Sequence, residues 1–344
     1  MISADEYQAY GTTLINFAEK ISSFSSPLAV GMSGNFRQMK RRILNIAVFR
    51  KETLYQKMRA LIIYLVISAV FIGCTPILSI DASTQSVYHF SDTDKNISLL
   101  DISETFGTYD GSFVLYDNNL DSWKIYDLEE ATKRIPPEST YKIYDALLGL
   151  ESGIITPEHS SMTWNGDAFP FPSWEADQDL NSAMQNSVNW YFQAIDSQLG
   201  INRVQEFLNK IEYGNQTTSS NLDLYWSDFS LKISPLEQVT LLKKFNTNEF
   251  HLNSQNVFSV KNAIKIASTP NGNFYGKTGT GRVNGQDING WFIGYVETSD
   301  NSYYFATNIQ SDSNATGKKA FEITSDILKK YIYGINKYER LIVV

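Results

Sequence analysis

The sequence predicts an α+β fold, in which an antiparallel sheet is covered by helices, preceded by one membrane-spanning helix. Three observations support this prediction. Residues 60–80 contain no charged side chain, strand-like segments lie at both ends of residues 81–344, and helical patterns lie between those strands. No linker, low-complexity tract or internal repeat interrupts 81–344, so we expect that region to be one domain.

Composition excludes several classes of protein. The chain has 344 residues, of which 42% are hydrophobic and 19% are charged, so global disorder is not expected. The formal net charge is −8, which argues against nucleic acid as a partner. A single cysteine, Cys74, excludes an internal disulfide and a thiolate zinc cluster.

The uncharged run at residues 60–80 is long enough to cross a lipid bilayer as a helix. Residues 1–59 carry nine basic and four acidic side chains, a net charge of +5, whereas residues 81–344 carry 20 basic and 33 acidic ones, a net charge of −13. The positive-inside rule then places 1–59 in the cytoplasm and 81–344 outside the cell membrane. Two alternatives are a buried core helix and a lipoprotein signal that begins at Met58.

Within 81–344, local patterns predict two hairpins and two helices. Aromatic and β-branched residues around Asn/Asp-rich turns predict the hairpins. Apolar residues at helical spacing predict the helices, the first of which follows Pro136 and Pro137. The predicted segments are strands Ser112–Asp117 with Trp123–Asp127, helix Tyr141–Leu150, strands Gly290–Glu297 with Tyr303–Gln310, and helix Phe321–Tyr331.

The sequence Ser139-Thr-Tyr-Lys142 could supply a nucleophile and its base. Positions i and i+3 share one face of a helix, so Lys142 can reach the Ser139 hydroxyl. A serine is a weak nucleophile until a base takes its proton, and a lysine can be that base when burial lowers its pKa. Alone, a Ser-x-x-Lys match is weak, because a surface serine beside a solvated lysine gives the same pattern.

Two further motifs strengthen this interpretation through their order. Ser187-Val-Asn189 follows Ser139 by 48 residues, and Lys277-Thr-Gly-Thr280 follows it by 138. On an edge strand facing a cleft, Lys277 would supply positive charge, Thr278 and Thr280 hydroxyl donors, and Gly279 room for a substrate. Ser-x-x-Lys, Ser-x-Asn and Lys-Thr-Gly, in that order, are typical of penicillin-recognising serine enzymes.

Longer segments resemble class D (OXA-type) β-lactamases and, most of all, the extracellular sensor domain of the BlaR/MecR β-lactam sensor-transducers. The resemblance spans roughly residues 85–333 and implies the serine β-lactamase/penicillin-binding fold. The segments that carry it are PESTYKIYDALLGLESGII, DLNSAMQNSVNWYFQAI, YGN, YWSDFSLKISPLEQ and YGKTGTG followed by NGWFIGYVE.

This resemblance implies a role for each motif residue. Ser139 is expected to be the acylated nucleophile, Lys142 a base carboxylated by CO₂, and Ser187 a proton relay. The substrate carboxylate is expected near Lys277, with hydrogen bonds from Thr278 and Thr280. Backbone N–H groups of Ser139 and Thr280 would form the oxyanion hole, and Trp226 would steady the modified lysine. No metal site is expected in the domain.

Asn189 favours a receptor over a hydrolase. Class D hydrolases usually have an apolar residue at this position, which protects the lysine carbamate. An amide can hydrogen-bond the free amine and favour loss of CO₂, so the base is missing when water must attack the acyl-enzyme. We therefore expect a β-lactam receptor with a long-lived acyl-enzyme; the alternatives are a class D β-lactamase and, less well matched, a transpeptidase.

The N-terminal part resembles the end of the receptors' cytoplasmic metalloprotease domain, through DEYQAYGTTLINFAEK and VGMSGNFRQMKRRILNIA. The chain contains only His89, His159 and His251, none of them in a His-Glu-x-x-His motif. We expect sensing but not proteolysis from this chain, with residues 1–59 a metalloprotease remnant and the rest of the protease missing or separately encoded.

Overall fold

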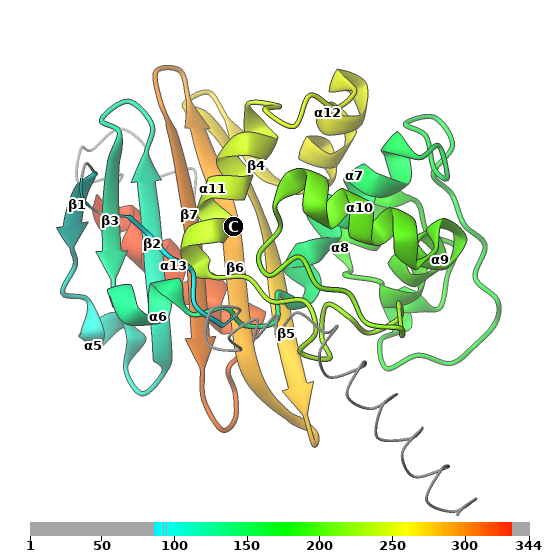
Figure 1. Cartoon of the computed structure of the whole chain (residues 1–344), viewed down its shortest axis with the longest axis horizontal. Helices are drawn as coiled ribbons and strands as arrows, with labels where there is room; N and C mark the ends of the chain where they lie inside the picture. The colour runs from blue at the N-terminus through cyan, green and yellow to red at the C-terminus, as the bar shows by residue number, and fades with distance from the viewer. Residues whose placement is uncertain (1–85, 92, 94, 332–344) are drawn as a thin grey trace, which may run out of the picture. The chain divides into compact units, whose positions relative to one another are not determined.

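A seven-stranded sheet runs through the part of the chain that the computed structural model describes, residues 86–331 without 92 and 94 (Figure 1). These residues lie within one unit, Ser79–Val344. No helix among them is both long and apolar enough to cross a membrane. The predictions for residues 1–59 and 60–80 fall outside the described residues.

The strand order in the sheet is β1-β3-β2-β7-β6-β5-β4. All neighbours run antiparallel, as predicted, except β1 and β3, which pair in parallel at one edge of the sheet. Most of β1 is exposed, and it therefore lacks the apolar pattern that would have revealed it. The strands are β1 (Asn96–Leu99), β2 (Asp110–Asp117), β3 (Ser122–Tyr126), β4 (Lys265–Thr269), β5 (Gly272–Val283), β6 (Gln286–Thr298) and β7 (Ser302–Gln310).

Helices cover both faces of the sheet, and a helical region stands beside its β5 end (Figure 1). The predicted hairpins are β2–β3 and β6–β7, and the predicted last helix is α13. The helices are α5 (Ser103–Phe106), α6 (Leu128–Thr132), α7 (Lys142–Glu151), α8 (Leu180–Gln185), α9 (Asn189–Leu199), α10 (Ile201–Ile211), α11 (Pro235–Asn246), α12 (Ser254–Ala263) and α13 (Gly317–Tyr331), with 3₁₀ turns η1 (Glu138–Tyr141) and η2 (Pro172–Trp174).

Side chains of strand β6 pack into two hydrophobic clusters, one on each face of the sheet. Trp291 and Ile293 belong to the cluster shared with the helical region, whereas Phe292 and Val296 belong to the cluster under α13. Successive strand side chains point to opposite faces, so this alternation without polar residues requires cover on both sides. The sheet is accordingly a middle layer between two packed layers.

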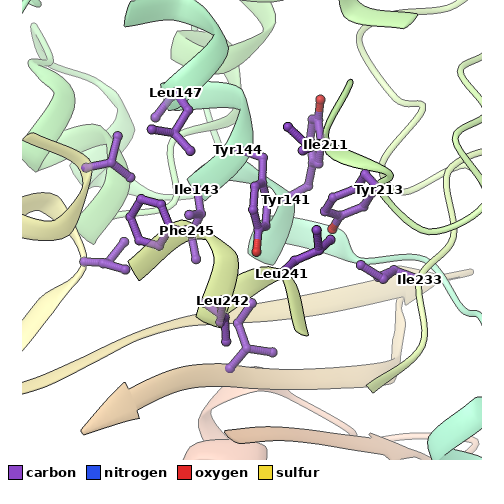
Figure 2. Close-up of a cluster of buried hydrophobic side chains, with 14 of the residues drawn as sticks. Tyr141, Ile143, Tyr144, Leu147, Ile211, Tyr213, Ile233, Leu241, Leu242 and Phe245 are labelled. Carbon is purple, nitrogen blue, oxygen red and sulfur yellow. The ribbon is translucent and has the colours of Figure 1, made fainter. Parts of the chain in front are cut away.

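The helix α7 lies at the centre of the larger cluster, and all its residues from Lys142 to Leu150 are buried. Ile143, Tyr144 and Leu147 pack there with Phe245 of α11, as Figure 2 shows. A helix that is covered all round occupies a fixed position, because each displacement would open a cavity. Lys142, at its first turn, is therefore held in the interior.

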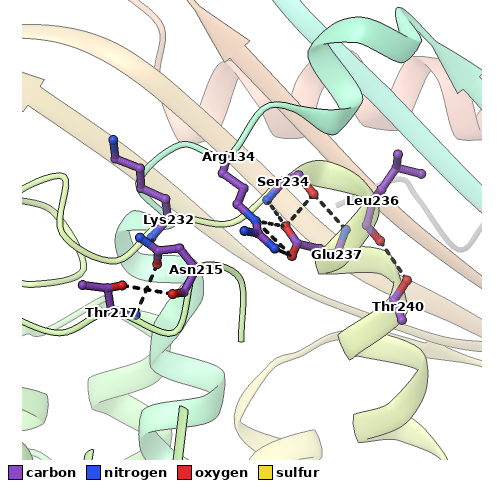
Figure 3. Close-up of polar contacts among 8 residues, drawn as sticks. All are labelled: Arg134, Asn215, Thr217, Lys232, Ser234, Leu236, Glu237 and Thr240. Carbon is purple, nitrogen blue, oxygen red and sulfur yellow. Dashed lines mark hydrogen bonds and ion pairs between the residues drawn. The ribbon is translucent and has the colours of Figure 1, made fainter. Parts of the chain in front are cut away.

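A buried ion pair anchors the segment that leads into α7. The Arg134 guanidinium contacts both carboxylate oxygens of Glu237, and both side chains are largely buried (Figure 3). Glu237 also accepts the backbone N–H of Ser234 at 3.0 Å and completes a capping box at the start of α11. Ile135 and Ile233 exchange two backbone hydrogen bonds next to this pair. These contacts fix the backbone just before Pro136 and Pro137.

Candidate active site

The turn that carries Ser139 is η1, and it is fixed from three directions. The Trp291 indole and the Asn289 amide both donate to the carbonyl oxygen of Pro136, at 2.8 and 3.1 Å. The Glu138 N–H donates to the Trp226 carbonyl at 3.1 Å. Glu138 has a φ of +52°, an uncommon conformation for a residue with a side chain. Such local strain is typical of functional sites and here shapes the turn that presents Ser139.

Lys142 contacts the Ser139 hydroxyl as the motif predicts, although Ser139 lies in a 3₁₀ turn and not in the α-helix itself. Lys142 Nζ lies 2.9 Å from Ser139 Oγ. The predicted helix Tyr141–Leu150 is confirmed as α7, with η1 ahead of it. Burial lowers the pKa of Lys142 to about 8, against the opposing effect of nearby carboxyl groups. An amine that loses its proton near neutral pH can act as a general base.

Ser187 and Asn189 join the two lysines of the site. The Asn189 Oδ1 atom, at the start of α9, accepts a hydrogen bond from Lys142 Nζ at 2.7 Å. The Ser187 hydroxyl, two residues earlier, accepts one from Lys277 Nζ of β5. Ser187 has a φ of +53°, so the chain turns sharply just before α9 and directs these two side chains to different lysines. The three predicted motifs therefore meet in one place.

Lys277 is buried in the wall of the site and donates to Ser187 and to the Thr278 carbonyl, the latter at 2.9 Å. Burial, followed by the charge of Lys142, lowers the pKa of Lys277 well below its usual value. Strand β4 pairs with β5 only as far as Tyr275, so among the described strands Lys277 and the residues after it have β6 alone as a partner. This half of β5 is the predicted edge strand.

The other residues of the Lys-Thr-Gly-Thr motif face two different neighbours: Gly279 faces the turn that carries Ser139, and the two threonines face Gly317. A Cβ atom on Gly279 would lie 3.2 Å from the Ser139 nitrogen, which shows how closely β5 approaches the nucleophile turn. Thr278 and Thr280 instead lie next to Gly317, whose N–H donates to Thr280 Oγ1 at 2.9 Å. Thr280 is exposed, and in this contact its hydroxyl oxygen is the acceptor.

Two aromatic rings form the apolar wall behind Lys142. Its Nζ lies 5.5 Å from the ring centre of Trp226 and 5.6 Å from that of Phe192. Trp226, predicted from sequence, is buried and stacks on Tyr141 at 6.3 Å between ring centres. Phe192 was not predicted, although its spacing of three residues from Asn189 on α9 was an available signal.

Three buried carboxyl groups near the lysine were also not predicted. Glu138 accepts the Asn289 amide at 3.2 Å, and burial raises its pKa to about 8. Asp145 and Asp196 are fully buried, and burial raises the pKa of both groups, that of Asp196 to about 8. Acidic residues are rarely buried without partners, so sequence alone gave no reason to place them here.

This geometry is the one that a serine acyl-transfer site requires. The Ser139 hydroxyl contacts the buried Lys142 amine, while a second lysine, Lys277, contacts a second hydroxyl, that of Ser187. The sequence of residues 108–329 matches the family model for the penicillin binding protein transpeptidase domain. The chain belongs to that family.

Within the family, the chain is homologous to the regulatory proteins BlaR1 and MecR1. It is 43% identical over 329 residues to "Regulatory protein BlaR1" of Bacillus licheniformis, covering 94% of this chain and 54% of that protein. It is 35% identical over 334 residues to the "Methicillin resistance mecR1 protein" of Staphylococcus aureus (strain Mu50), covering 96% of this chain and 56% of that protein. The chain thus spans about half the length of these relatives.

Solved structures agree with the assignment of the fold. The C-terminal domain of the Bacillus licheniformis BlaR penicillin-receptor matches with a TM-score of 0.67 and 46% identity, over 69% of this chain and 97% of that one. The class D β-lactamase BAT-2 matches with a TM-score of 0.64 and 37% identity, over 68% of this chain and 96% of that one. The predicted penicillin-binding, class D-like fold is therefore confirmed, and the matching BlaR structure is that of a C-terminal domain by itself.

Proposed function

We propose that this chain is a membrane-anchored β-lactam receptor, acylated at Ser139 to give a long-lived acyl-enzyme that signals the presence of antibiotic. The observation that carries the proposal is the position of Lys142 Nζ, 2.9 Å from Ser139 Oγ and 2.7 Å from Asn189 Oδ1. Through the first contact, the Lys142 amine can act as the base for acylation of Ser139. Through the second, Asn189 stabilises the ammonium that results, so the same amine is not free to act as the base for deacylation. The relatives' names, a regulatory protein and a penicillin-receptor domain, support the assignment.

Acylation follows from the contacts of Ser139. As Lys142 takes the hydroxyl proton, Ser139 Oγ bonds to the β-lactam carbonyl carbon and the ring C–N bond then breaks. The Ser187 hydroxyl accepts a hydrogen bond from Lys277 Nζ, so it gives its own hydrogen to the departing ring nitrogen and takes one from the Lys277 ammonium in return. The backbone N–H groups of Ser139 and Thr280 stabilise the oxyanion, and Lys277 with Thr278 and Thr280 holds the substrate carboxylate.

Deacylation is slow because it needs a free base a second time. After acylation Lys142 carries the proton that it took from Ser139, and the Asn189 oxygen, which accepts a hydrogen bond from Lys142 Nζ, stabilises that ammonium. An ammonium has no lone pair with which to activate water. The acyl-enzyme therefore persists, as a receptor requires.

Carboxylation of Lys142 is a further part of the proposal. CO₂ on this nitrogen would supply a carboxylate base in place of an amine. The Ser139 hydroxyl, the Trp226 indole and the Asn189 amide, after rotation, provide donors for it, but the negative charge of the buried Asp145 and Asp196 pair opposes a further negative charge nearby. We expect the modification to be labile, and a carbamate signal from ¹³C-bicarbonate in the NMR spectrum of the free domain tests it.

The topology is proposed from charge alone. Residues 60–80 span the membrane once, 1–59 lie in the cytoplasm and 81–344 lie outside the cell. A metalloprotease portion that is encoded separately would complete the signalling path. Protease added to intact cells should digest 81–344 and leave 1–59 protected; the reverse pattern would contradict this orientation.

A chromogenic β-lactam separates the receptor from a hydrolase. Mixed with the domain of residues 79–344, it should give one burst equal to the protein concentration and then almost no further colour. Ser139→Ala should abolish the burst, while Ser152→Ala, at the far end of α7, should leave it unchanged. Sustained turnover over many equivalents would instead support the alternative, a class D β-lactamase. The structural similarity to the class D β-lactamase BAT-2 is the reason to test for it.

A further inference from the structure

A pair of buried aspartates lies behind the catalytic lysine and has no role in the chemistry above. Asp145 lies three residues after Lys142 on α7, and Asp196 lies seven residues after Asn189 on α9. Both spacings keep the residues on one face of a helix. Because α7 packs on α9, the face of α9 that sends Asn189 to Lys142 also brings Asp196 to Asp145.

The two carboxyl groups lack hydrogen-bond partners on most of their oxygen atoms. Both residues have no exposed surface. Among the described residues, neither the two oxygens of Asp145 nor the Oδ2 atom of Asp196 has a hydrogen-bond partner, and Asp196 Oδ1 accepts only the Tyr225 hydroxyl, at 3.4 Å. Two carboxylates have no hydrogen between them, so their contact becomes a hydrogen bond only when one carries a proton.

The charges around the pair point to one partner. Burial keeps the surrounding tyrosine hydroxyls neutral by raising their pKa, and Asp223 is exposed. Lys142 is the cation among the groups that act on both aspartates. The titratable groups that face the pair or Lys142 are Tyr141 of η1, Tyr191 of α9, Asp223 and Tyr225 of the loop after α10, Glu138 of η1 and Lys277 of β5.

Neutrality selects the state of the pair. If both aspartates are ionised beside an ammonium, the buried group has a net charge of −1, and if neither is ionised it has a net charge of +1. One shared proton gives zero, the state that a low-dielectric interior favours. When Lys142 is a free amine, two protons on the pair again give zero.

We propose that Asp145 and Asp196 share one proton and together act as the buried counterion of Lys142, stabilising the ammonium that forms when Lys142 accepts the proton of Ser139. The inference rests on the proposed function only for the role of Lys142 as the base. In that step the Ser139 O–H bond breaks, an N–H bond forms on Lys142, and the oxygen keeps the electron pair for the carbonyl carbon. The aspartates are positioning residues, since they touch neither substrate nor Ser139.

Asparagine substitutions test the shared proton specifically. An asparagine imitates a protonated aspartate, so Asp145→Asn or Asp196→Asn alone leaves one carboxylate with a donor beside it and keeps the counterion. The double variant removes the negative charge. Asp223→Asn is the matched control, because it removes an exposed carboxylate close to Asp196.

The first measurement is an NMR titration of Lys142 in the free domain, residues 79–344, with labelled lysine side chains. Each single variant and Asp223→Asn should keep the Lys142 pKa within about half a unit of the wild-type value, and the double variant should lower it by about one unit or more, as loss of a nearby opposite charge does. An unchanged pKa in the double variant, or an equal fall in each single variant, would overturn the proposal.

The second measurement does not require the double variant to fold. The infrared spectrum of wild-type protein labelled with ¹³C-aspartate should retain a protonated carboxyl band at pH 7, which each single variant loses; labelling separates it from Glu138. Absence of the band in the wild type would overturn the proposal. No β-lactam is used, so failure of acylation would count against the receptor function and not against the counterion.

Discussion

Replacement of Asn189 by valine should shorten the lifetime of the acyl-enzyme. The change removes the oxygen that Lys142 Nζ contacts at 2.7 Å and leaves an apolar side chain of similar size. A hydrogen bond to a charged group contributes about 1.5–3 kcal/mol. Since about 1.4 kcal/mol corresponds to one pKa unit, the pKa of Lys142 should fall by about one to two units from its value of about 8.

The expected rate follows from the fraction of free amine. At pH 7 that fraction is about 0.09 with the wild-type pKa of about 8, and it rises to roughly 0.5–0.9 after the fall in pKa. Deacylation should therefore be roughly 5- to 10-fold faster at pH 7. The sign is that of a lysine: loss of a partner of the ammonium lowers the pKa, so the advantage appears below pH 8 and disappears above about pH 9.

The assay follows the mass of the acylated domain against time from pH 6 to 9. Asn181→Val, an exposed change on α8, should have the wild-type lifetime. Equal lifetimes for Asn189→Val and wild type at pH 7 would refute the proposed role of the asparagine. A rise that is the same at every pH would show that the side chain acts by shape and not through the lysine.

Three further predictions concern stability and the approach of β5. Glu138→Gln should stabilise the domain by about 3 kcal/mol at pH 7, because the native carboxyl, with its pKa raised to about 8, resists the ionisation that the unfolded chain undergoes near pH 4.5. Urea titrations should show that stability falls less from pH 5 to 8 in the variant than in the wild type. Part of the fall stays in both proteins, because the pKa values of Asp145 and Asp196 are also raised. Arg134→Ala, which leaves the Glu237 carboxylate buried, should lower the free energy of unfolding by about 3–5 kcal/mol, whereas Arg282→Ala, at an exposed ion pair, should change it far less in the same titration. Gly279→Ala should slow acylation about tenfold or more, because its Cβ would lie 3.1 Å from the Pro137 oxygen and 3.2 Å from the Ser139 nitrogen; a wild-type acylation rate constant would show that the turn yields freely.

The sequence could predict those contacts of the site that join residues close together in the chain. Ser139 and Lys142 lie three residues apart in one continuous helical turn, so their contact follows from the chain itself. The meeting of Ser187 with Lys277, 90 residues later, could not be derived from spacing. It required the family resemblance, because the contact joins a loop before α9 to the free edge of β5.

The features that sequence missed depend on burial. Asp145 and Asp196 occupy positions that in isolation suit exposed polar faces of helices, and only the packing of α7 and α9 makes them interior. The side chains of Thr278 and Thr280 lie next to Gly317, the first residue of α13. No pattern in the strand indicated which element would cover that face.

The proposed receptor function requires that Ser139 is acylated once and remains acylated. Intact-mass spectrometry of the domain with an excess of a penicillin tests it most directly, with peptide mapping to locate the adduct. We expect one adduct per molecule, located on Ser139, that persists long after free antibiotic is removed, and no adduct on the Ser139→Ala variant. An adduct on another residue, or rapid return to the unmodified mass while antibiotic is consumed, would contradict it.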